Sequence, residues 1–162
     1  MKKTFSNKGI SVIEIIIGAS IIAITFVLTI SVYSSLLKLS GEALPRIQGA
    51  MIADEGVQAL RSMRDDSFSS NIASLALDTP YYLVWSQASS SFFATTTPVV
   101  IDNTFYRTFT LSNMYRDGNQ NIAPSGTLDF DGRFADINVS FQKRNGTSTQ
   151  VLQTYILNTF NN

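Results

Sequence analysis

The sequence predicts an α+β protein, in which a long N-terminal helix is followed by an antiparallel β-sheet head. Three observations predict this class. Residues 10–30 form an almost purely apolar run, and apolar residues recur at spacings of three and four between 47 and 60. Beyond residue 66, β-branched and aromatic residues come in short runs separated by polar loops. Helical patterns therefore precede strand patterns, which is typical of an α+β arrangement.

The apolar run is long enough to cross a membrane. Between Lys8 and Lys38 lie 29 residues, of which Glu14 alone is charged. As a helix, residues 10–30 would span about 31 Å, close to the ~30 Å hydrocarbon core of a bilayer. Three lysines precede the run and only Lys38 follows closely. The positive-inside rule therefore predicts a single-pass protein with its N-terminus in the cytoplasm and residues from about 40 onward outside.

Glu14 is the unusual residue of this segment. A charge at the middle of a membrane helix costs roughly 2.5 to 3.5 kcal/mol on insertion scales. Glu14 lies four residues after Ile10, about 6 Å along a helix axis. Its carboxylate could reach the headgroups, helped by the positive end of the helix dipole. Alternatively, it pairs with a cation at the same depth, such as a free amine on Ile10 after cleavage behind Gly9.

A second helical segment is predicted over residues 40–66. Pro45 should kink or briefly break the helix before it. An apolar stripe then resumes, and such a stripe normally packs against a sheet of the same domain. The stripe consists of Ile47, Ala50, Ala53, Val57 and Leu60.

The remaining chain, residues 67–162, is expected to form the sheet. Alternation is clearest over 135–142, and Asn145-Gly146 is a hairpin signal after it. Strands are predicted at 81–85, 99–101, 104–114, 135–142 and 149–158. We expect a Ser/Thr-rich loop at 86–97, and we expect Trp85 to lie in the core.

Two acidic turns are weak candidates for calcium binding. Asp117, Asn119 and Asn121 alternate in DGNQN, a plausible spacing for oxygen ligands, but no bidentate Glu follows at the right distance. Asp129 and Asp131 form the second acidic turn. Turn formation is the simpler interpretation of both segments, so no metal site is assigned.

Composition narrows the function classes. The 162 residues suit one domain, or one domain with an appended segment. Cys and His are absent, which excludes disulfides, thiolate or imidazole metal sites, and Ser-His-Asp or Cys-His catalysis. The net charge is zero, so no basic field favours nucleic acid. We expect no cofactor, no nucleic-acid partner and no enzymatic activity.

The segment from Gly9 to Glu14, with basic residues before it and an apolar helix after it, resembles a known processing signal. This signal is the prepilin cleavage site of type IV pilins and type II secretion pseudopilins. Residues 52–66 are similar to the second helical half of minor pilins. The resemblance implies a leader at 1–9, a membrane and filament-core helix at 10–39, an amphipathic helix at 40–66 and a pilin-like β-sheet head at 67–162.

The resemblance further implies a structural subunit, like a minor pilin, of a type IV pilus. A prepilin peptidase would cut after Gly9 and methylate the new amine of Ile10. The subunit would then polymerise through its N-terminal helix, with Glu14 meeting the Ile10 amine of a neighbouring copy. Its expected partners are other pilin subunits, the peptidase, an assembly platform and the membrane. Its expected locations are the inner membrane and then a periplasmic or cell-surface filament.

Alternative functions remain open from the sequence. A pseudopilin of a type II secretion or DNA-uptake system would share the same N-terminal signal. A signal-anchored extracellular binding protein or enzyme would keep a permanent membrane helix and would tolerate Glu14→Val. A sugar- or surface-binding adhesin carried on a filament would use the loops at 86–97 and 117–126.

Overall fold

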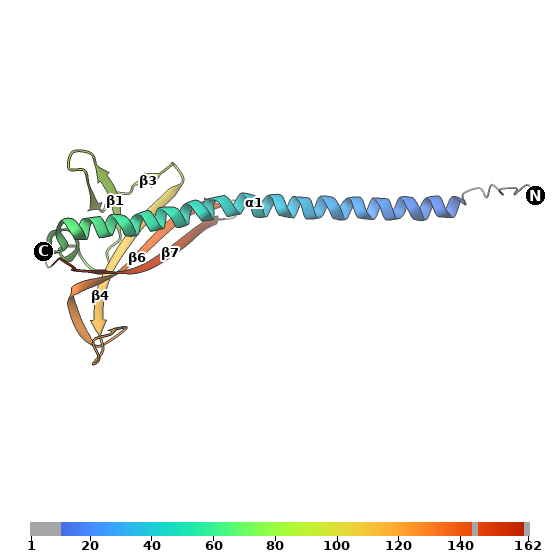
Figure 1. The fold of residues 1–162 in the computed structure, drawn as a ribbon. Helices are drawn as coiled ribbons and strands as arrows, with labels where there is room; N and C mark the ends of the chain where they lie inside the picture. Colours follow the sequence, from blue (N-terminus) through green and yellow to red (C-terminus); the bar gives the residue numbers. More distant parts are fainter. Residues whose placement is uncertain (1–10, 144–145, 161–162) are drawn as a thin grey trace, which may run out of the picture. The chain divides into compact units, whose positions relative to one another are not determined.

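The computed structural model of the chain describes residues 11–143 and 146–160. Within these residues it contains one long α-helix, a short π-helix and seven β-strands (Figure 1). The predicted α+β class is therefore confirmed. The elements are α1 (Val12–Phe68), η1 (Ser69–Ala73), β1 (Tyr81–Ser86), β2 (Ser91–Thr95), β3 (Val100–Ile101), β4 (Phe105–Arg116), β5 (Ile122–Ala123), β6 (Thr127–Lys143) and β7 (Gly146–Leu157).

The chain divides into two compact units, Met1–Ala43 and Leu44–Asn162, which are described separately. The first unit contains the apolar part of α1. The second unit joins the remaining turns of α1 to the whole sheet. The helical residues from Leu44 to Asp66 thus belong with the sheet, as the predicted packing of an amphipathic helix requires.

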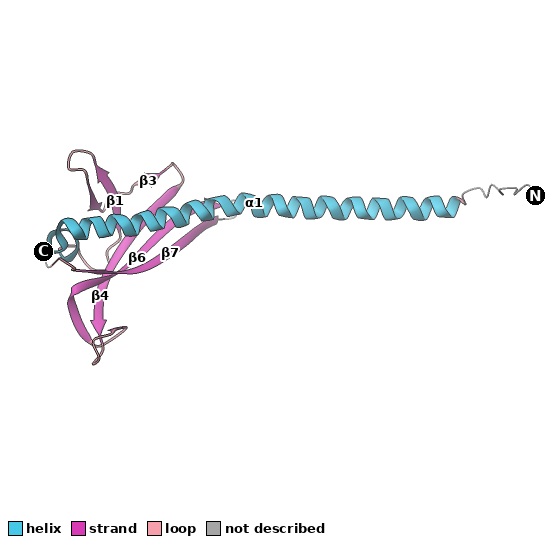
Figure 2. Cartoon of the chain, in the orientation of Figure 1, coloured by secondary structure: helices cyan, strands magenta, loops and turns pink. Residues whose placement is uncertain are grey.

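The sheet is antiparallel and open, with the strand order β2-β1-β4-β6-β7 (Figure 2). The short strands β3 and β5 both pair with β4. The long strands β4 and β6 run in register from Phe105↔Phe141 to Asn113↔Arg133, and a bulge then shifts the pairing. Each predicted strand is present. Because side chains alternate between the faces, the odd-numbered β4 residues from Phe105 to Leu111 face α1 and the even-numbered ones face away.

The predicted loop at 86–97 is wrong, because it contains strand β2 paired with β1. The predicted burial of Trp85 is wrong as well, since this side chain is 50% exposed. Trp85 instead packs edge-on against its cross-strand neighbour Phe92, with ring centroids 4.9 Å apart. A pair of this kind stabilises a hairpin through its own contact, without burial under the helix.

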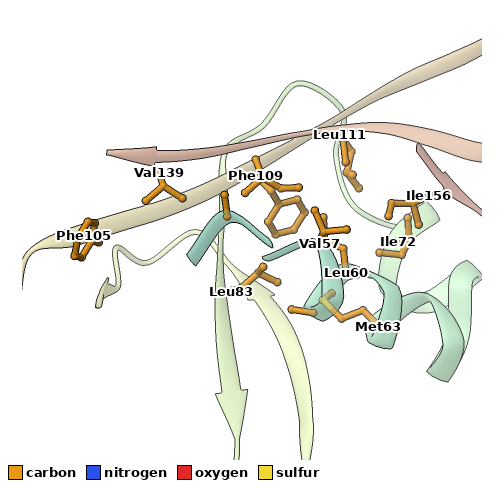
Figure 3. Close-up of a cluster of buried hydrophobic side chains, with 14 of the residues drawn as sticks. Val57, Leu60, Met63, Ile72, Leu83, Phe105, Phe109, Leu111, Val139 and Ile156 are labelled. Atoms are coloured by element: carbon orange, nitrogen blue, oxygen red, sulfur yellow. The ribbon is translucent and has the colours of Figure 1, made fainter. Parts of the chain in front are cut away.

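One face of the sheet and the last turns of α1 enclose the hydrophobic core (Figure 3). Leu60 of α1, Phe109 of β4 and Ile156 of β7 are fully buried. Ile72 of the π-helix joins them, so the chain beyond α1 also covers the core. Burial of one such side chain contributes about 1.5–3 kcal/mol, so this cluster is the main source of stability of the second unit.

The buried face of α1 differs in part from the predicted stripe. Ala53, Val57 and Leu60 are buried as predicted, but Ile47 and Ala50 are exposed. Two glycines take their place, since Gly49 and Gly56 are both buried. A Cβ atom on Gly56 would lie 3.0 Å from Arg107 Cδ and 3.2 Å from Ile137 Cγ2, and one on Gly49 would lie 3.2 Å from Phe141 Cε1. The helix therefore approaches the sheet closely at these two glycines, which have no side chain to keep the backbones apart.

The predicted interruption near Pro45 is wrong. The helical backbone runs through Pro45, and within α1 only Ser67 has non-helical φ and ψ, at −169° and 112°. Proline lacks an N–H group, so the carbonyl of Gly41 loses its usual helical partner. The proline φ is nevertheless compatible with a helix. With many helical turns on each side, one lost hydrogen bond is not enough to end the helix.

Arg107 is a charged residue within the core. Its side chain is 4% exposed, between Phe105 and Phe109 on the face of β4 that meets α1. Its Nη1 donates to the carbonyl of Ile52 at 3.0 Å and lies 3.3 Å from the carboxylate of Glu55. Arg107 therefore joins α1 to the sheet by polar contacts in the space that the absent side chain of Gly56 leaves open.

Candidate functional site

In the described part of the first unit, α1 exposes its apolar side chains. Isoleucine, valine, leucine and phenylalanine residues from Val12 to Leu39 are half or more exposed. Among the described residues, α1 is the one helix long and apolar enough to cross a membrane. Water is a poor solvent for such a surface, so this part of the chain needs a hydrocarbon or protein environment.

The polar side chains in this segment do not alter that property. Ser20, Thr25, Thr29 and Ser35 donate hydrogen bonds to the carbonyl groups four residues earlier, at 2.7–3.0 Å. Each hydroxyl proton is thus satisfied inside the helix, as a hydrocarbon environment requires. Among residues 12–37 of this helix, Glu14 alone carries a charge.

Glu14 lies in the first turn of α1 and its side chain is exposed. Its backbone N–H donates to the carbonyl of Ser11 at 3.0 Å, which closes the first turn. Within the described part of the chain, no Lys or Arg forms an ion pair with its carboxylate. The next basic residue along the helix is Lys38. At 24 positions further on, it is about 36 Å away in an ideal helix.

The predicted processing residues Gly9 and Ile10 lie outside the described residues, as does the predicted leader at 1–9. Glu14 therefore lies in the first helical turn, and no described residue places a positive charge beside it. A carboxylate at the N-terminus of a helix is favoured by the helix dipole, by about 0.3–1 kcal/mol at exposed sites. That amount is smaller than the cost of holding the charge in hydrocarbon.

The first calcium candidate is a hydrogen-bonded turn. Asp117 Oδ1 accepts from the backbone N–H groups of Asn119 and Asn121 at 2.8 and 2.9 Å. Its Oδ2 accepts from Asn121 Nδ2 at 3.3 Å. The backbone hydrogen bond from Asn121, followed by the one from Asn119, lowers the pKa of Asp117. The carboxylate of Asp117 thus closes a turn, which agrees with the simpler interpretation of DGNQN.

The second candidate turn carries an ion pair. Asp129 Oδ2 accepts from Arg116 Nε at 2.5 Å, and Asp129 Oδ1 accepts from the N–H of Asp131 at 2.9 Å. Arg116 Nη1 also donates to the carbonyl of Gln120 at 2.8 Å, so this guanidinium links the two acidic turns. A cation already occupies the position between them. Among the described residues, no group of three or more acidic side chains could hold a metal ion.

The Arg116–Asp129 pair gives stability a predictable pH dependence. Hydrogen bonding to Arg116 lowers the pKa of Asp129 below its ordinary value. The contribution of this ion pair to the unfolding free energy is therefore complete above about pH 4, the ordinary pKa of an aspartate in an unfolded chain. It is lost as the pH falls through the folded-state pKa of Asp129. We expect Asp129→Asn to flatten the fall in unfolding free energy below pH 4, measured by urea denaturation at successive pH values. Asp131→Asn, whose side chain forms no ion pair with a described residue, should keep the wild-type slope.

Sequence reasoning found the residues of both turns but missed the cation that joins them. Arg116 and Asp129 are 13 positions apart and meet because β4 and β6 pair beyond the bulge, where Met114 faces Asp129. In continuous register Met114 would face Gly132 instead of Asp129, and sequence alternation gives no signal of such a shift. Searches with this chain found no matching family model, no matching curated protein and no matching solved structure.

Proposed function

We propose that this chain is a filament subunit of the prepilin class, similar to a minor pilin of a type IV pilus. It is inserted in a membrane through the first part of α1 and is cleaved between Gly9 and Ile10. It then polymerises through the same helix. The β-sheet head remains outside the membrane and carries no catalytic role.

The supporting observation is the carboxylate of Glu14 in the first turn of an exposed apolar helix, where it forms no ion pair with a described Lys or Arg. A permanent membrane anchor gains nothing from this charge, which costs several kcal/mol in hydrocarbon when unpaired. Cleavage behind Gly9 would release an ammonium group on Ile10, four residues before Glu14. The amine of an adjoining copy could then neutralise the carboxylate, so assembly would relieve a cost that the membrane imposes.

Cleavage is the first step of this proposal, and the N-terminus of the mature chain tests it. We expect mass spectrometry of membrane-extracted protein to show a chain that begins at Ile10, with or without one added methyl group. Gly9→Leu should block cleavage because the residue before the cut is small. Gly18→Leu is the matched control, since nothing lies within 4 Å of a Cβ atom added at Gly18. An intact Met1 in the wild-type protein would favour a signal-anchored binding protein or enzyme instead.

A further inference from the structure

A groove of about 500 Å³ lies in the β-sheet head. Its floor includes Ser112 of β4, Phe134 of β6 and Tyr155 of β7, which are in register across three strands. These side chains face away from α1, because their neighbours Leu111, Ala135 and Ile156 are buried in the core. Strand β5 with Pro124 after it, and Asp78 in the loop before β1, form the walls. The volume lies within the range of small-molecule sites.

Aromatic rings cover part of the groove. The rings of Phe134 and Tyr155 are adjacent, with centroids 5.2 Å apart and planes tilted by 52°. Tyr115 lines the same groove from β4. Tyr155 is 46% exposed although its ring is large and apolar. The rings thus offer an accessible apolar surface.

Polar side chains surround these rings. Asp78, Ser112, Asn113, Tyr115 and Tyr155 all line the groove. None of their side-chain oxygen or nitrogen atoms is hydrogen-bonded to another described residue, and none is buried from solvent. The backbone N–H of Asp78 donates to the carbonyl of Leu111 at 2.8 Å, which fixes Asp78 at the edge of the groove. Hydroxyl and amide groups both donate and accept, so the groove suits a ligand that does both.

The charges of the lining restrict the ligand further. Among the residues lining the groove, Asp78 is the one with a charged side chain, and no Lys or Arg is present. A phosphate, a sulfate or an acidic sugar would therefore meet a carboxylate without a compensating cation. The ligand should be neutral or positively charged.

We propose that this groove binds a neutral carbohydrate, of about the size of a disaccharide. The C–H face of a sugar ring is apolar and can lie on the rings of Phe134 and Tyr155, while its hydroxyl groups exchange hydrogen bonds with Ser112 and Asn113. The carboxylate of Asp78 accepts from two adjacent hydroxyls. A quaternary ammonium ion would use the rings and the carboxylate. It would make no hydrogen bonds with the hydroxyl and amide groups of the lining, whereas a sugar can, so the polar lining favours the sugar.

Binding can be measured on the full, unassembled chain, so the result does not depend on filament formation. The chain is held in micelles of an ethylene-oxide detergent, which has neither a sugar nor an ammonium headgroup. The probes are cellobiose and N,N′-diacetylchitobiose, with choline and inorganic phosphate as the contrasting ligands. We expect saturable binding of at least one disaccharide by calorimetry and saturation-transfer NMR, with a dissociation constant of about 1 mM or below.

Variants place the binding in the groove. Tyr155→Ala should weaken disaccharide binding about tenfold or more, because the stacking ring is lost. Tyr155→Phe keeps the ring and should retain most of the affinity. The control is Tyr106→Ala, which removes a similarly exposed tyrosine of β4 on the same face of the sheet but outside the groove. Circular dichroism confirms that each variant is folded.

Three outcomes would overturn the assignment. The first is that neither disaccharide binds. The second is that a disaccharide binds equally well to the folded Tyr155→Ala variant, which would place the site elsewhere. The third is that choline or phosphate binds while the sugars do not, which would give the groove a different ligand class. Each outcome leaves the N-terminal cleavage test unaffected, so the two proposals fail separately.

Discussion

Glu14→Gln is expected to reduce the amount of assembled filament at least about tenfold, while membrane insertion and cleavage behind Gly9 continue. The variant keeps the size of the side chain and removes its charge. In an assembled filament, the amine of Ile10 on the adjoining copy would then be buried without a counter-charge. Breaking a buried ion pair by removing one partner costs about 3–5 kcal/mol, equivalent to two or more orders of magnitude in an association constant. Filament yield is measured by shearing cells and probing the released fraction for this subunit.

Ser20→Ala is the matched control for this substitution. Ser20 is exposed on the same helix, and its hydroxyl bonds only to the carbonyl of Ile16 within the described residues. Its removal should leave the filament yield unchanged. Wild-type yield from Glu14→Gln would contradict the proposed pairing. Loss of the protein from the membrane fraction would show instead that Glu14 acts before assembly.

Gly56→Leu is expected to destabilise the second unit by about 1–3 kcal/mol, the usual cost of overpacking a filled core. A single added Cβ atom would already approach Arg107 Cδ to 3.0 Å, and a longer side chain must displace Arg107 or separate α1 from β6. The better helix propensity of leucine, about 1 kcal/mol over glycine, offsets part of this cost. Urea denaturation followed by circular dichroism measures the difference.

Gly41→Leu provides the comparison, because it places the same side chain on the same helix where nothing lies within 4 Å of the added Cβ atom. It should leave the unfolding free energy unchanged or raise it slightly. Equal effects of the two substitutions would mean that the close approach at Gly56 does not limit the packing of the core.

Periodic patterns predicted the elements that depend on local chemistry. The apolar run and the stripe at Ala53, Val57 and Leu60 predicted the helix and its buried face. Alternation over 135–142 predicted the central part of β6, in which Ala135 and Ile137 are fully buried. In each case the side chains that alternate in the sequence are those that separate into buried and exposed faces.

Features that depend on distant contacts gave no such signal. Gly49 and Gly56 were missed because a hydrophobicity count gives no weight to a residue without a side chain. The burial of Arg107 gave no signal either, because it depends on the carbonyl of Ile52, 55 positions earlier. The groove was missed for the same reason, since Ser112, Phe134 and Tyr155 come together only through strand register.

The close contacts at Gly49 and Gly56 also have a mechanical consequence. The buried face of α1 has its smallest residues where the strands come nearest, and bulkier side chains such as Met51 lie elsewhere around the helix. Turning the helix about its axis would drive those bulkier side chains into the strands, because packed interiors have no spare volume. A torque applied to these turns of the helix would therefore be transmitted to β4 and β6, and the contact would resist rotation of the helix relative to the sheet.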